Sequence, residues 1–135
     1  MANALYAKGR EGFLDGSIDW DTHTISMIGM DHLDDTPVPA TDDNLDDLLA
    51  AGRVGSWTPF ATKTVTDGVA DAADITDTTV TGDQFESLNI YKDTGVEATS
   101  RLIAYIDVAT GLPCTPNGGD ITVQWDDGAS KIFKL

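Results

Sequence analysis

The stretch RLIAYIDV, residues 101–108, decides the fold expected for this chain. Successive side chains of a β-strand point to opposite faces. Leu102, Ala104 and Ile106 fall on one face, and Ile103 and Tyr105 fall on the other. Neither face is plainly polar, and a strand that is apolar on both faces is typical of a sheet interior. We therefore expect a central strand that is covered on both sides.

Strand signals continue on either side of this stretch. Residues 22–30 place Ile25, Met27 and Ile28 in a run that favours a buried strand. From Gly55 onward the strand-like segments are SWTPFATKTVT, DGVADAADITDTTV, DQFESLNIYKD, ATSRLIAYIDVATG and GGDITVQWDDGASKIFKL. The turn signals between them are Asp67-Gly68, Thr81-Gly82-Asp83, Asp93-Thr94-Gly95 and Pro116-Asn117-Gly118-Gly119. This spacing predicts a mainly β fold, an antiparallel β-sandwich or barrel.

The last of these segments predicts a hairpin. Ile121, Val123 and Trp125 alternate with polar residues, and Asp126-Asp127-Gly128 can turn the chain back. We expect residues 121–125 to pair with residues 131–135 and to close the fold.

Two short helices are also expected. An apolar pattern near helical spacing runs through residues 1–16, which predicts an N-terminal helix or arm. Gly9 and Gly12 interrupt this pattern, and each glycine costs up to about 1 kcal/mol against alanine inside a helix. The segment TDDNLDDLLAAG begins with capping residues and ends at Gly52, which predicts a second helix near residues 43–51. Its acidic residues suit capping of the helix start and solvation.

Length and composition limit the class of protein. A chain of 135 residues suits a single domain, residues 1–135. Hydrophobic residues make up 41% but occur in short runs, none near the ~20 residues of a membrane-spanning helix. Lys8, Arg10 and Glu11 interrupt the apolar core that a signal peptide needs, so synthesis and action in the cytoplasm are expected.

The charge balance argues against nucleic acid as a partner. The chain has 23 acidic and 8 basic residues, a formal net charge of -15. Nucleic-acid affinity depends on cationic neutralisation of phosphates, which this surface would repel. No membrane partner is expected either. Cys114 is the only cysteine, which excludes an intrachain disulfide and a zinc site of several thiolates.

Acidic residues also mark the stretch TKTVTDGVADAADITDTTVTGDQ, residues 62–84. Its apolar residues suffice for one packed face and not for two, so we expect a solvated sheet edge whose charges discourage aggregation. A calcium site is the alternative. Calcium loops need six to eight converging oxygens at a defined spacing. Asp67, Asp71, Asp74 and Asp77 do not follow that spacing, and no metal or other cofactor is predicted.

No motif for catalysis is present, and the chain is not expected to be an enzyme. His23 and His32 lie near acids but lack the helical spacing of a metalloprotease motif. No serine lies in a GxSxG elbow. Cys114 has no basic side chain nearby in the sequence and is interpreted as a small turn residue.

Three segments carry a resemblance to a known group of proteins. They are NALYAKGREGFLDGSIDWDTHTI, KTVTDGVADAADIT and YKDTGVEATSRLIAYIDVATGLPCTPNGGDITVQWDDGASKIFKL. Together they resemble a family of small structural proteins of tailed bacteriophages. The resemblance implies a virion structural protein, and size and acidity favour a decoration (cement) protein on the outer capsid surface.

This role would require apolar anchors on a rigid scaffold. The partners would be the major capsid protein and copies of the chain itself, and a homotrimer would suit three-fold capsid positions. The candidate anchors are Leu5, Tyr6, Phe13, Leu14, Trp57 and Phe60. The alternative for these six residues is that they close the core of the protein itself.

Other functions remain open from the residues alone. Within the virion, a tail or head-to-tail connector component would form a ring or tube. A carbohydrate-binding module would use exposed aromatic side chains with aspartates. A small hydrolase would need two carboxylates, or a histidine and a serine, in one cleft.

Overall fold

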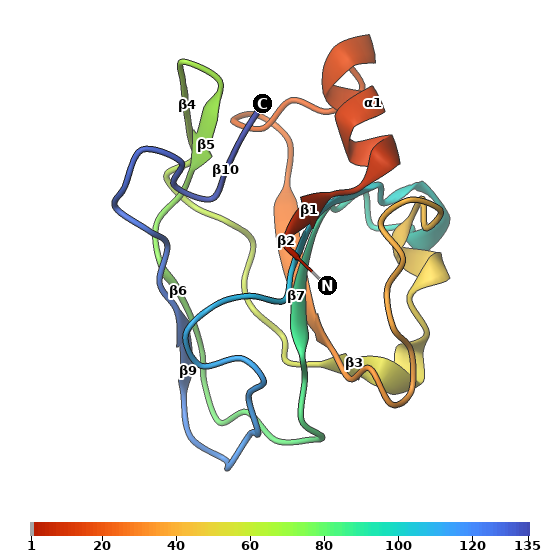
Figure 1. Ribbon diagram of the computed structural model, residues 1–135, viewed down its shortest axis with the longest axis vertical. Coiled ribbons are helices and arrows are strands. Elements are labelled where there is room, and N and C mark those ends of the chain that lie inside the picture. Colours follow the sequence, from red (N-terminus) through yellow and green to blue (C-terminus); the bar gives the residue numbers. More distant parts are fainter. Residues whose placement is uncertain (1) are drawn as a thin grey trace.

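A five-stranded antiparallel sheet forms the middle of the molecule, which is described for residues 2–135 in a computed structural model (Figure 1). The strands, in spatial order, are β1 (Ala4–Leu5), β8 (Leu102–Ile106), β7 (Ser87–Lys92), β2 (Ile25–Met30) and β3 (Arg53–Val54). The predicted strand at residues 101–108 is confirmed as β8, which lies between β1 and β7 and is buried over most of its length. The buried strand predicted within residues 22–30 is confirmed as β2.

Two smaller antiparallel sheets cover one face of this sheet. One has the order β10 (Phe133–Lys134), β5 (Val69–Asp71) and β4 (Thr64–Thr66). The other pairs β6 (Ile75–Asp77) with β9 (Ile121–Val123). Figure 1 shows both sheets along one side of β2 and β7. The predicted mainly β, antiparallel fold is therefore confirmed; the layers are sandwich-like and do not close into a barrel.

Helical segments lie at the other side and at one end. Helix α1 (Ala7–Asp15) confirms the predicted N-terminal helix. The prediction of one helix at residues 43–51 is wrong in form, because two short 3-10 helices, η1 (Leu45–Asp47) and η2 (Ala50–Gly52), take its place. Leu48 interrupts them in an extended conformation with its side chain fully buried. A third 3-10 helix, η3 (Glu97–Thr99), precedes β8.

The predicted C-terminal hairpin is wrong. β9 pairs with β6, and β10 pairs with β5, so the two segments belong to different sheets. The alternation of apolar and polar residues identifies both segments as strands, but it does not indicate which strand each of them pairs with. In this fold Ile121 and Val123 of β9 and Phe133 of β10 all pack against the large core, and each strand does so from the sheet in which it is paired.

The core has two parts, one on each face of the five-stranded sheet. The large cluster lies between the sheets and includes Trp20, Ile25, Trp57, Phe60, Phe85, Ile90 and Ile103. The small cluster lies under η1 and contains Tyr6, Met30, Leu45, Leu48, Leu102 and Tyr105. The faces predicted for β8 need one correction: Leu102 lies in the small cluster, whereas Ile103 joins Ala104 in the large one. The pairs Ile90–Ala104 and Tyr91–Leu102 leave Ile103 without a partner on β7, a β-bulge that shifts the alternation.

The acidic stretch at residues 62–84 behaves as predicted. β4 is exposed throughout, whereas Ala70, Ala72, Ile75 and Val80 are buried. Asp67 and Gly68 both have positive φ and turn β4 into β5. The part from Ala70 to Val80 therefore packs one face and exposes the other, whereas Val65 in β4 is exposed with its neighbours. Among residues 2–135, no helix has the length and apolar character needed to cross a membrane.

Candidate functional site

The structure separates the six predicted anchors into three groups. Tyr6, Trp57 and Phe60 are buried in the protein's own core, with 0%, 5% and 5% of their surface exposed. Leu5 and Phe13 are partly buried against the large cluster. Leu14 is 90% exposed. Of the six residues, only Leu14 presents most of its side chain to a partner.

Local contacts explain why the aromatic segment at residues 57–60 is buried. The Phe60 amide donates to the Ile25 carbonyl of β2 at 2.8 Å. The Trp57 indole N–H donates to the Ile121 carbonyl of β9 at 3.4 Å. Gly55 has a φ of +87°, and the Trp57 ring occupies the space where a Cβ at this position would lie. The segment thus bridges the central sheet and the β6–β9 sheet.

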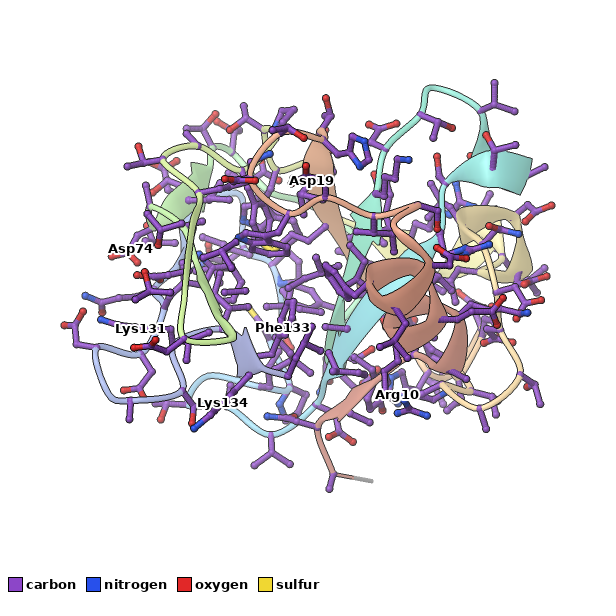
Figure 2. The ribbon with its side chains drawn as sticks, turned by 90° about the horizontal axis from the view of Figure 1, so that it is seen from above. Arg10, Asp19, Asp74, Lys131, Phe133 and Lys134 are labelled. Carbon is purple, nitrogen blue, oxygen red and sulfur yellow. The ribbon has the colours of Figure 1, made fainter. Side chains whose placement is uncertain are left out.

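A more promising surface lies where α1 ends beside the β4–β5 hairpin and β10. We call it the apical groove. It has a volume of about 430 Å³, and its lining includes Phe13, Trp20, Val65, Phe133, Leu135 and the carboxylates Asp19 and Asp21. Figure 2 looks down on this end and shows Phe133 between the hairpin and α1.

Packed aromatic rings form the floor of the apical groove. The Phe133 ring lies 5.7 Å from the Phe13 ring and 5.2 Å from the Trp20 ring, measured between centroids. Trp20 also meets Phe60 edge-on at 5.7 Å and donates its indole N–H to the Asp71 carbonyl at 3.0 Å. β10 holds Phe133 opposite Ala70 of β5. The floor therefore belongs to the large core, while Val65 and Leu135 remain 54% and 59% exposed at the rim.

Sequence reasoning missed most of this groove. It selected aromatic residues flanked by proline and glycine, and the fold buries those residues. The available signal was Val65, an apolar residue in the otherwise polar strand Thr64–Thr66. The approach of β10 to α1 had no local signal, because it depends on the pairing of β10 with β5.

A histidine and a serine do come together, but inside the protein. His32 Nε2 lies 2.9 Å from Ser87 Oγ. Asn89 Nδ2 donates to the same Oγ at 3.0 Å, and the Tyr6 hydroxyl donates to Asn89 Oδ1 at 2.7 Å. Ser87 is 0% exposed, so a substrate cannot reach its hydroxyl in this conformation. These contacts form a chain of buried hydrogen bonds that satisfies polar groups in the small cluster.

We expect Tyr6→Phe to lower the free energy of unfolding by about 1–2 kcal/mol, because it leaves the buried Asn89 Oδ1 without its donor. Burial raises the pKa of Tyr6, so its hydroxyl keeps the proton that it donates. Urea denaturation followed by circular dichroism measures the loss. In an Asn89→Ala background the same substitution should cost much less. Equal losses in both backgrounds would show that this hydrogen bond contributes nothing.

The other candidate groups do not form a site. His23 and His32 flank opposite ends of β2, a six-residue strand, which separates them by about 20 Å. The four aspartates Asp67, Asp71, Asp74 and Asp77 do not converge; within residues 2–135, the acids that do are Asp31, Asp34 and Asp83, whose oxygens lie within 4.8 Å of one another. Asp34 and Asp83 are exposed, and Asp31 Oδ1 accepts the Leu33 amide at 2.8 Å. Burial raises the pKa of the Cys114 thiol, which disfavours the reactive thiolate.

Comparison with known proteins adds no assignment. No known protein family has a model that matches this chain. No match was found among curated proteins either. The apical groove therefore has to be interpreted from its own chemistry.

Proposed function

We propose that this chain is a bacteriophage virion structural protein that decorates the outer surface of the capsid and stabilises the head. It would bind the major capsid protein and neighbouring copies of itself after synthesis in the host cytoplasm. The resemblance of its three long segments to small phage structural proteins supports this role. The structural observation that carries the proposal is the apical groove, an apolar surface at one end of a rigid β scaffold.

The physical properties of the chain suit such a role. The net charge of -15 keeps free subunits soluble and apart before docking. The affinity would then come from apolar contacts, which dominate the centres of protein interfaces. A specific interface buries about 1,600 Å² in total, so one subunit needs only a small part of its surface for it. Many copies on a lattice would multiply the stabilisation.

Reconstruction of purified phage particles tests this proposal. We expect density for this fold at regular positions on the outside of the head, with the apical groove facing the capsid lattice. Density in a tail or neck ring would instead identify the tail or head-to-tail connector component. Absence of the chain from purified particles, established by mass spectrometry, would overturn the virion role altogether.

A matched pair of variants tests the surface itself. Leu14→Ser changes a side chain in the last turn of α1 that is 90% exposed, so it should alter the free energy of unfolding by less than about 0.5 kcal/mol. It should nevertheless weaken binding to particles stripped of this protein, because the proposed binding mode places this end of the molecule, with the exposed apolar side chain of Leu14, against the capsid lattice. Leu33→Ser is the control, since Leu33 is 94% exposed in a different segment, the turn after β2. Equal binding by both variants would exclude the end of α1 from the interface.

A further inference from the structure

The charged side chains of the apical groove indicate what kind of segment it can bind. Among the lining residues that the structure describes, only Asp19 and Asp21 have charged side chains, and both are exposed. They lie on the loop between α1 and β2, where Figure 2 labels Asp19. The apolar floor and the acidic rim therefore occur together in one groove.

The two carboxylates are only partly neutralised by nearby basic side chains. Neither belongs to an ion pair among residues 2–135. A hydrogen bond to Asp19 and the negative charge of Asp19 raise the pKa of Asp21, as expected for two neighbouring carboxyl groups. Lys63 opposes this effect, but its ammonium group donates to the His23 carbonyl oxygen. A cation placed between the carboxylates would offset their repulsion.

The same charges argue against a second copy of the chain as the occupant. Each copy carries a net charge of -15, so pairing two acidic rims would bring like charges together. The basic residues near this end are already engaged: Lys92 donates to the Ser17 carbonyl at 2.8 Å, and Arg101 lies 3.8 Å from Asp15. Charge complementarity therefore favours a different protein that supplies both an apolar and a basic side chain.

We propose that the apical groove binds a protein segment in which a leucine or aromatic side chain is flanked by lysine or arginine. The apolar side chain packs on Phe133 and Val65, and the basic side chain pairs with Asp19 and Asp21. This inference deepens the proposed function and rests on it for the identity of the partner, which would be a basic segment of the capsid protein. The chemistry of the groove can be tested without any particle.

The first test titrates the isolated protein with the blocked pentapeptide acetyl-Gly-Lys-Leu-Arg-Gly-amide, followed by amide NMR shifts and by tryptophan fluorescence. We expect shifts confined to residues 13–21, 65–70 and 133–135. At ~0.01 M salt this peptide should bind about fivefold more tightly than the analogue with Asp and Glu in place of Lys and Arg. The difference should shrink at ~1 M salt, where the screening length falls to about 3 Å. A peptide with glycine in place of leucine should also bind more weakly than the basic peptide. This loss should be at least as large as the difference between the basic and the acidic peptide.

Variants of the protein complete the test. Asp19→Asn with Asp21→Asn should weaken binding of the basic peptide about fivefold, and Val65→Ser should weaken the binding of both charged peptides. The control, Asp126→Asn with Asp127→Asn, makes the same change in net charge on a loop outside the groove and should leave binding unchanged. Any of three results would overturn the inference. The basic and acidic peptides could bind with equal affinity, the amide NMR shifts could fall outside the groove, or the two double variants could have equal effects.

The outcomes separate this inference from the proposed function. Failure of peptide binding together with capsid density would overturn the groove chemistry and leave the decoration role intact. Specific peptide binding together with absence from particles would overturn the decoration role and leave the groove chemistry intact.

Discussion

Replacing Trp20 with alanine is expected to lower the free energy of unfolding by about 3–5 kcal/mol. Trp20 is 3% exposed, and its ring joins the loop after α1 to Phe60 and Phe133. The substitution would leave a cavity between the sheets and remove the donor to the Asp71 carbonyl. Small domains are stable by about 5–15 kcal/mol in total, so this single change would remove a large share of that stability.

Urea denaturation followed by far-UV circular dichroism measures this loss without relying on tryptophan fluorescence. Trp125→Ala is the matched control. Trp125 is only partly buried, and its indole N–H has no hydrogen-bond partner among residues 2–135, so its removal should cost less. If the two substitutions cost the same, Trp20 does not have the central role that its contacts indicate. Loss of Trp20 should also abolish the peptide binding proposed for the apical groove, because Trp20 supports Phe133.

Gly9→Ala is expected to destabilise the protein by about 2–3 kcal/mol, although alanine is the better helix former by about 1 kcal/mol. A Cβ on Gly9 would lie 2.8 Å from the Ile103 Cα and from the Ile103 and Leu102 carbonyl oxygens. These are backbone atoms of β8 at its bulge, and they cannot move without distorting the central sheet. The helix would have to shift away from the sheet, and the hydrogen bond from the Tyr6 amide to the Ile103 carbonyl would be strained.

Gly12→Ala provides the control on the same helix. There a new Cβ would overlap the Cγ1 and Cδ1 atoms of the buried Ile18 side chain, and a side chain can yield more readily than the backbone of a central strand. We expect its cost to be smaller by at least 1 kcal/mol, because the gain in helix propensity partly offsets the contact. Thermal unfolding of both variants, compared at one temperature, gives the difference. A stabilising effect of Gly9→Ala would show that α1 does not approach β8 so closely.

Gly9 illustrates how far local rules extend. Propensity alone counts this glycine as a weakness of the N-terminal helix, yet in the fold it permits the close approach of α1 to β8. The rule describes the cost of glycine to an isolated helix correctly. The rule does not consider the backbone of β8, which lies against this helix although its residues are almost a hundred positions away in the sequence.

The candidate site shows the same difference between what a local sequence pattern indicates and what the fold decides. The residue types that an adhesive surface needs, apolar side chains on an acidic β domain, are visible in the sequence, and one of the predicted anchors, Leu14, is exposed. Of the residues that line the groove, Phe13 was among the predicted anchors, but Asp19, Val65 and Phe133 were not, because they come from three distant segments. Tyr6, Trp57 and Phe60 look equally suitable in the sequence, and their burial follows from contacts with β7, β9 and β2.

The sequence by itself determined the mainly β class, the buried strand at residues 101–108, the N-terminal helix and the solvated acidic edge. Each of these follows from the alternation, composition or turn residues of one short segment. Only the tertiary structure decided that β9 and β10 belong to different sheets, that Ile103 bulges, and that α1, β5 and β10 enclose a groove. Strand partners and grooves depend on which distant apolar faces can be buried together at the lowest cost in chain entropy, and no single segment carries that information.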